Sequence, residues 1–312
     1  MCACISHKDI VKFEINRLFC ISSLQKTQNM QLTGSLIGVD VGGTKMHFAR
    51  IESGKVTCQT LIPTDAHRRR EDILDDVLTG IDSVLDKSVR GIGIGVPGLV
   101  DTVEGVVLKA TNIPCIEGIP LGGTVKERFG LPALLGNDAN CFALGEKHYG
   151  KGKDYDDVVG ITLGTGVGAG IIVGGRVYEG NCAMAGEFGS MGYLDSDFET
   201  YCSGKFFMRR YGDSALNIAQ AAADDDTRAL GIFREYGRHV GNLLHVILLS
   251  CAPSAIILGG SLTKSHSYFR AGMEETLSSF PYPHVIEKTC IDFSEDPHMP
   301  VLGAAALTIG RI

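Results

Sequence analysis

Apolar positions along this chain change from strand-like alternation to helical spacing several times, which predicts strands and helices in turn. Three strands joined by tight turns are expected first, over 36–41, 45–51 and 56–62. Residues 71–86 then carry apolar side chains at helical spacing. Further strands are predicted over 91–96, 131–135, 255–258 and 285–292, and further helices over 124–129, 139–149, 199–211, 214–223, 226–250, 265–279 and 303–309. The pattern is that of an α/β chain with mixed sheets.

One local pattern occurs twice. Gly42-Gly43-Thr44 and Gly164-Thr165-Gly166 each follow a predicted strand, and second tight turns at Gly54 and Gly175 fall at the same offset. A single glycine-rich turn between strands is compatible with a plain hairpin. Two in register indicate two related halves whose backbone amides can hold a polyphosphate between them. The repeat therefore predicts nucleotide-dependent phosphoryl transfer.

Composition narrows the class of protein. A chain of 312 residues suits two domains, and the net charge of −7 without a basic block argues against a nucleic-acid partner. Two uncharged stretches, 158–175 and 240–260 (apart from His245), have the length of membrane spans. Glycines in the first favour a hairpin and Pro253 divides the second, so no membrane partner is expected. Ten scattered cysteines, none in Cys-x-x-Cys, indicate reduced thiols and a cytoplasmic location.

The first turn carries candidate chemistry beyond its glycines. Thr44 supplies a hydroxyl donor and Lys45 a counter-charge for phosphate. Asp40 can hold Mg²⁺ directly or through water, because Mg²⁺ prefers oxygen ligands and keeps several waters. Gly259-Gly260 ends a predicted strand, where a base or ribose can approach the backbone closely.

Asp138 admits two interpretations. Asn137-Asp138 precedes a predicted helix, and Asn and Asp are favoured N-caps, so spacing alone favours a capping role. A carboxylate there can also serve as the general base that takes a proton from a sugar hydroxyl. Glu187 and Glu199 supply acidic groups that can bind sugar hydroxyls, or can be ordinary surface residues.

Seven motifs in order give the chain a family resemblance. It resembles the ROK sugar kinases (repressor, open reading frame, kinase) from about residue 36 to the end. The motifs occupy 40–45, 95–98, 137–144, 163–170, 186–189, 199–204 and 257–260.

The resemblance implies an actin-like, RNase H-like ATPase fold with two related domains around an interdomain cleft that binds ATP. We expect one domain over 35–136, joined by a C-terminal helix over 301–312, and the other over 137–300. Asp138 then corresponds to the catalytic base, which overrides the capping preference. The sugar side comprises Gly98, Asn112, Asn137, Asp138, Glu187 and Glu199. The nucleotide side comprises Asp40, Gly42, Gly43, Thr44, Lys45, Gly164, Thr165, Gly166, Gly259 and Gly260.

The expected reaction is transfer of the γ-phosphate of ATP, with Mg²⁺, to a hydroxyl of glucose or a related hexose. An N-acetylglucosamine, N-acetylmannosamine or fructose kinase is the alternative, because no residue identifies the sugar. A sugar-binding protein without catalysis and a ROK-type transcriptional regulator are the alternatives from other classes. Residues 1–34 are too short for the regulators' DNA-binding segment. Homodimers are common in the family.

Residues 1–34 do not join the strand and helix pattern. Met30 lies just before the first strand, so we expect translation of the natural protein to begin there, or the upstream segment to be a loosely held extension. The intact mass of the natural protein would decide, since a mass that includes residues 1–29 contradicts the later start.

The chain departs from the family at its zinc site. Members usually carry a His after Gly-Glu-x-Gly and a Cys-x-Cys-Gly-x-x-Gly-Cys loop before the next glutamate. Here Ser190 replaces the His, no cysteine lies between it and Glu199, and Cys202 alone cannot rebuild four ligands.

We therefore predict that the purified protein binds no structural zinc. Elemental analysis should find far less than one zinc per chain, and about one equivalent would contradict the prediction.

Overall fold

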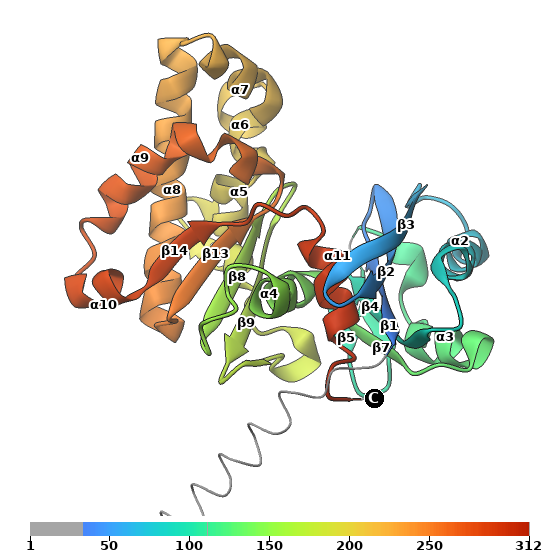
Figure 1. Ribbon diagram of the computed structural model, residues 1–312. Helices are drawn as coiled ribbons and strands as arrows, with labels where there is room; N and C mark the ends of the chain where they lie inside the picture. The colour runs from blue at the N-terminus through green and yellow to red at the C-terminus, as the bar shows by residue number, and fades with distance from the viewer. Residues whose placement is uncertain (1–33, 111, 312) are drawn as a thin grey trace, which may run out of the picture.

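The computed structural model describes residues 34–110 and 112–311, which form two lobes that each contain a five-stranded sheet (Figure 1). Most of the predicted 1–34 extension lies outside these residues. The first sheet has the strands β1 (Ser35–Val41), β2 (Lys45–Glu52), β3 (Lys55–Pro63), β4 (Val89–Val96) and β7 (Ala133–Asn137). The second has β8 (Val158–Leu163), β9 (Val167–Val173), β10 (Arg176–Val177), β13 (Ala255–Gly259) and β14 (Cys290–Phe293).

The two sheets share one topology, as the repeated turns predicted. The strand orders are β3-β2-β1-β4-β7 and β10-β9-β8-β13-β14. In each sheet an antiparallel meander is followed by two strands that run parallel to its first strand. β1 and β8 therefore occupy equivalent central positions, and the glycine-rich turn follows each of them. The uncharged stretch 158–175 is a hairpin, as the sequence indicated.

Helices cover both sheets. In the first lobe α2 (Arg70–Val84) and α3 (Leu121–Phe129) lie on the outer side (Figure 1). In the second lobe α8 (Thr227–Cys251) and α9 (His266–Leu277) pack together on the outer side. Smaller helices complete that lobe: α5 (Phe198–Cys202), α6 (Gly204–Tyr211), α7 (Ala215–Ala223) and α10 (Pro283–Lys288). Among the described residues, no helix combines the length and the apolarity that a bilayer crossing requires.

Two helices lie between the sheets, α4 (Asp138–Tyr149) and α11 (Met299–Ala306) (Figure 1). β7 of the first sheet runs into α4 without a linker residue, and α4 covers the inner face of the second sheet. α11 returns to the first sheet and packs on β1. The chain therefore passes between the lobes within the α4–α11 pair.

The α4–α11 pair is packed backbone against backbone. A Cβ built on Gly303 would lie 1.6 Å from the carbonyl oxygen of Cys141, and one on Gly145 would lie 2.2 Å from that of Met299. Gly38 of β1 approaches α11 equally closely, since its Cβ would lie 1.9 Å from the Val301 oxygen. Side-chain-free positions on both helices let them approach to this distance.

A second segment also crosses between the lobes. Thr102, after the short strand β5 (Leu99–Asp101), donates from its hydroxyl to Glu179 at 2.8 Å. Ala183 lies four residues after Glu179 and is buried in the core of the first lobe. The predicted domain division at residue 136/137 stays a prediction, and this segment extends from the second sheet to the first core.

The prediction of the last strand was wrong in its bounds. The region predicted as one strand over 285–292 contains α10 and then β14, because Pro283 at the start of α10 favours a helical first turn. The C-terminal helix likewise begins at Met299, with Pro300 in its first turn, instead of at residue 303. The hairpin of β5 and β6 (Val106–Lys109) was not predicted. The predicted helix over 199–211 is interrupted at Ser203.

We expect Gly303→Ala to destabilise the fold by at least about 2 kcal/mol, because the added methyl overlaps backbone that has no rotamer to change. Urea denaturation would measure this. Gly231→Ala is the matched control. Gly231 lies on the exposed side of α8 with open space around its Cβ, and this variant should gain roughly 0.5–1 kcal/mol. Equal stability of the two variants would contradict the close packing.

Candidate active site

The first glycine turn joins β1 to β2 and is held from behind by Thr64. The Gly42 amide donates to the Lys45 carbonyl at 3.0 Å. The Thr64 hydroxyl donates to the Gly42 carbonyl at 2.5 Å, and its amide donates to the Thr44 carbonyl at 3.0 Å. Thr64 is fully buried, whereas Thr44 and Lys45 are exposed. The turn is therefore fixed, with its hydroxyl and ammonium groups directed to solvent.

Thr64 could not be predicted as a support of this turn, since it lies in a loop twenty residues farther along the chain. The reason for the glycines also differs from the prediction. Neither Gly42 nor Gly43 has a positive φ. Gly43 is required by close approach, because its Cβ would lie 3.0 Å from Cβ of Asn112. Asn112, predicted on the sugar side, thus lies against the first turn.

The second turn joins β8 to β9 and is fixed by the segment after Glu199. The Gly164 amide donates to the Gly166 carbonyl at 3.0 Å, and the Gly204 amide donates to the Gly164 carbonyl at 2.8 Å. A Cβ on Gly166 would lie 2.5 Å from Oε2 of Glu199. Thr165 at the tip is exposed.

Gly259 and Gly260 lie beside this second turn. Gly260 has a φ of +94°, and its Cβ would lie 2.3 Å from the Leu163 carbonyl oxygen. Gly259 is buried against the ring of Phe142, since a Cβ built on it would lie 2.4 Å from Cζ of that ring. Gly260 is exposed, so only this glycine faces outward. The structure therefore brings the predicted nucleotide residues of the second lobe together.

Asn137 caps α4, which leaves Asp138 in the first turn of the helix. The Asn137 oxygen accepts from the amides of Ala139 at 2.9 Å and Asn140 at 3.1 Å. Its amide group donates to the Gly98 carbonyl at 3.0 Å, so the buried side chain already has partners on both ends. Asn137 was predicted to contact sugar directly. That contact stays a prediction, and the bonds of the side chain fix Gly98 and the start of α4.

Gly98 is constrained by its backbone. Its φ is +97°, and a Cβ would lie 2.2 Å from the Lys109 carbonyl oxygen. Only glycine satisfies both conditions, so the role visible at this position is to form the loop after β4.

The carboxyl groups of Asp40 and Asp138 both have raised pKa values, and the charge of Asp40 contributes to the shift of Asp138. Asp40 is the last residue but one of β1, and burial raises its pKa to about 6 although Lys45 opposes the shift. Burial and the charge of Asp40 raise the pKa of Asp138 to about 7. The Asp138 carboxyl also accepts from the Ala139 amide at 2.9 Å. A carboxylate with a pKa near 7 is suited to take and release a proton at neutral pH.

The acidic group continues to the other predicted sugar residues. Glu187 contributes to the raised pKa of Asp138, and partial desolvation and the charge of Glu199 raise the pKa of Glu187 itself. Four carboxyl groups predicted from separate motifs therefore lie near one another, from Asp40 through Asp138 and Glu187 to Glu199. The Glu199 carboxylate also accepts from the Val167 amide, directly after the second turn. Its position in the sequence did not indicate this contact.

Comparison with known proteins decides the family. The ROK family profile matches residues 36–311. The chain belongs to the ROK family. Its fold is accordingly the actin-like ATPase fold that the resemblance implied, with equivalent sheets in two lobes.

Relatives in the ROK family include enzymes with different sugars. The glucokinase of Thermotoga maritima is 27% identical over 316 residues, which cover 89% of this chain and 98% of the relative. The N-acetyl-D-glucosamine kinase of Salmonella newport is 31% identical over 255 residues, 72% of this chain and 84% of the relative. A ROK family glucokinase from Streptomyces griseus, solved with glucose and AMPPNP, is 28% identical with a TM-score of 0.75. It covers 88% of this chain and 99% of its own.

Aromatic contacts organise the loop in which ROK proteins usually carry zinc ligands. The ring of Tyr193 stacks on Phe198 with centroids 4.3 Å apart, and its hydroxyl is hydrogen-bonded to Nδ1 of His239 at 3.1 Å. Cys202 lies fully buried below them, where burial raises the pKa of its thiol. No group of three or more potential metal ligands occurs in residues 34–110 and 112–311. The absence of zinc remains a prediction for elemental analysis.

The raised pKa of Asp138 has a consequence for stability. Because the folded state holds this proton more tightly than an unfolded carboxyl of pKa 3.8, stability falls as pH rises from about 4 to 7. We expect Asp138→Asn to be more stable than the wild type by up to about 4 kcal/mol at pH 8, narrowing to about 1 kcal/mol at pH 4.5.

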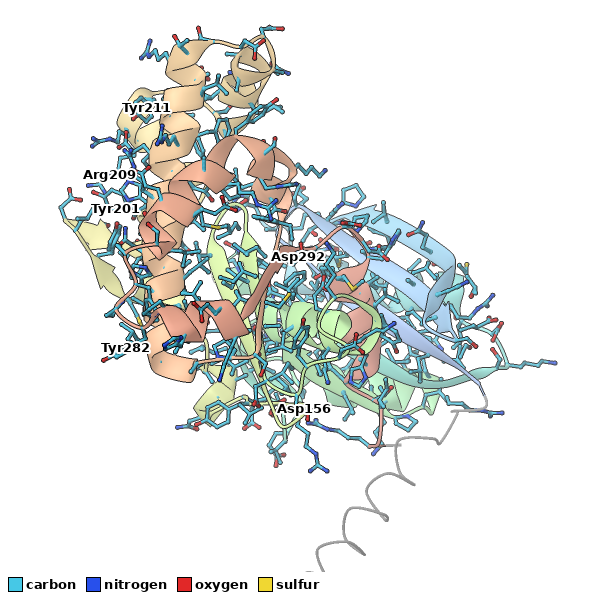
Figure 2. All side chains as sticks on the ribbon, turned by 60° about the vertical axis from the view of Figure 1, so that its left-hand side comes forward. Asp156, Tyr201, Arg209, Tyr211, Tyr282 and Asp292 are labelled. Carbon is cyan, nitrogen blue, oxygen red and sulfur yellow. The ribbon has the colours of Figure 1, made fainter. Side chains whose placement is uncertain are left out.

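Urea denaturation at both pH values would measure the difference. The control is Asp156→Asn, since the Asp156 side chain is 83% exposed (Figure 2). That variant should stay within about 0.5 kcal/mol of the wild type throughout. A stability difference for Asp138→Asn that does not depend on pH would contradict the electrostatic origin.

Proposed function

We propose that this ROK protein transfers the γ-phosphate of ATP to a hydroxyl group of a hexose, with Asp138 as the general base. The observation that carries the proposal is the position of Asp138. It begins α4 beside Asp40 of the first turn, has a pKa of about 7, and lies within reach of the charge of Glu187. Asp138 thus lies between Asp40, on the side proposed for ATP, and Glu187, on the side proposed for the sugar.

The donor side supplies phosphate binding from both lobes. Thr44 and Lys45 extend from the first turn, and Thr165 extends from the second. Hydroxyl, ammonium and backbone amide groups stabilise the negative charge of phosphate oxygens. Gly260 lies beside the second turn and leaves space for the nucleoside part of ATP. ATP binding by a family member of known structure, in the form of its analogue AMPPNP, supports this assignment.

The chemical step needs a proton acceptor. The hexose hydroxyl oxygen forms a bond to the γ-phosphorus while the bond from that phosphorus to the β–γ bridging oxygen breaks, and ADP leaves with the bond electrons. Asp138 takes the hydroxyl proton during the transfer. Closure of the lobes would exclude water, which otherwise competes with the sugar as acceptor.

Asp40 fits a Mg²⁺ ligand. Its carboxyl is desolvated, and its charge raises the pKa of Asp138, so a divalent cation bound here would offset the cost of that buried negative charge. Mg²⁺ bound to ATP neutralises phosphate charge during transfer. Asp40 would hold it directly or through water.

The sugar is proposed as glucose, with N-acetylglucosamine, N-acetylmannosamine and fructose as the alternatives. Glucokinases and an N-acetylglucosamine kinase among the relatives support this range. Glu187 lies near Asp138 and is proposed to accept a hydrogen bond from a sugar hydroxyl, and Ser190 replaces the family histidine beside it. The free thiols of the seven described cysteines support a cytoplasmic location.

A coupled assay of ADP release over these four hexoses, with MgATP, tests the function. Turnover with one or more of them is expected. Sugar binding without ADP release from any of them would favour the alternative of a non-catalytic sugar-binding protein.

Asp138→Asn should lose at least about 1000-fold in kcat while its sugar dissociation constant changes by less than about fivefold, because the amide keeps the shape but cannot accept the proton. Calorimetric titration with the sugar and the ADP assay would measure the two quantities. Wild-type kcat/KM, with both substrates below saturation, should fall as pH decreases below about 7. Retained turnover in the variant would remove Asp138 as the base.

A further inference from the structure

The Glu199 carboxylate is bonded to the residue that follows the second turn through one oxygen, and to Lys205 of α6 through the other. Oε2 accepts from the Val167 amide at 3.2 Å, and Oε1 pairs with the Lys205 ammonium at 2.5 Å. The same oxygen Oε2 would lie 2.5 Å from a Cβ on Gly166. Glu199, which we assigned to the sugar side, therefore lies against the second turn, which we assigned to phosphate.

Lys205 is fixed near this turn by the backbone around it. Ser203 is buried and caps α6, accepting from the Lys205 amide at 3.2 Å. The adjacent Gly204 amide donates to the Gly164 carbonyl at 2.8 Å. The start of α6 is thus bonded to the second turn, while the Lys205 side chain itself is 54% exposed and free to change partner.

A bound phosphate group and the Glu199 carboxylate are both anions that need hydrogen-bond donors at this turn. A polyphosphate on the second turn needs amide and ammonium donors, and Val167 and Lys205 are the donors that Glu199 now uses. Two anions cannot share them without strong repulsion at this distance. A phosphate group that bound these donors would therefore displace the Glu199 carboxylate from them.

We propose that Lys205 is a phosphate-binding residue and that Glu199 exchanges partners between the donor turn and the sugar, so that nucleotide and sugar each strengthen binding of the other. The inference rests on the proposed function, because it assigns a sugar contact to Glu199. Reciprocity follows from linkage, since a nucleotide that raises sugar affinity must be bound more tightly when the sugar is present by the same factor.

We expect Lys205→Met to change the affinities for nucleotide and for sugar in opposite directions. Lys205→Met removes a donor from phosphate and also releases Glu199 from the turn. AMP-PNP binding should weaken by about fivefold or more, whereas sugar binding without nucleotide should become tighter. The ratio of sugar dissociation constants without and with Mg-AMP-PNP, expected at about fivefold or more in the wild type, should approach one. Loss of a merely structural contact would weaken both ligands.

The measurement is calorimetric titration with Mg-AMP-PNP and with whichever of glucose, N-acetylglucosamine, N-acetylmannosamine or fructose the ADP assay turns over. Lys205→Arg should keep most of the coupling. The control is Arg209→Met, because Arg209 lies on the same helix with a side chain 52% exposed and pairs with Asp195 at 3.0 Å, at the outer edge of the lobe (Figure 2). It should leave both affinities within about twofold, as expected for an exposed ion pair.

An unchanged coupling ratio in Lys205→Met, or weakened sugar binding with unchanged AMP-PNP binding, would overturn the proposal. Failure of the proposed function is a separate result, namely no ADP release by the wild type with any of the four sugars. Turnover by the wild type together with a coupling ratio near one would refute the partner exchange alone.

Discussion

The close packing of α4 against α11 is the constraint on which the two-lobed arrangement depends. Gly145 and Gly303 allow backbone to meet backbone, and Gly38 brings β1 to the same helix pair. A side chain at these positions would separate the two sheets. Because α4 begins with Asp138 and α11 packs on β1, which ends beside Asp40, this packing also sets how near the two carboxyl groups lie. The architecture and the electrostatics of the site therefore have one common origin.

Residues that act locally could be predicted from the sequence. The glycine-rich turns, the strands beside them and the start of α4 are each specified within a few residues, and the equivalent strand orders confirmed the repeat. Contacts between distant segments could not be predicted. Thr64 supports a turn twenty residues away, Asn137 uses its amide on Gly98, and Glu199 reaches the Val167 amide. Such partners depend on folded geometry, for which a single sequence carries no spacing rule.

The candidate site concentrates negative charge beside the turns that we propose bind phosphate. Asp40, Asp138 and Glu187 have raised pKa values, for which burial is the first cause, while Lys45 follows the first turn and Lys205 lies in α6 beside the second. Such an arrangement opposes folding and favours proton transfer, as is common where activity and stability conflict.

The direct passage from β7 into α4 has a mechanical consequence. Asn137 is the last residue of a strand in one sheet, and Asp138 is the first residue of a helix that covers the other, with nothing between them. If the lobes rotate toward each other, the peptide unit joining these residues lies close to the pivot. Points near a rotation axis travel least. Asp138 would then keep its place, whereas any part of the two glycine-rich turns that lies farther from the axis would move more.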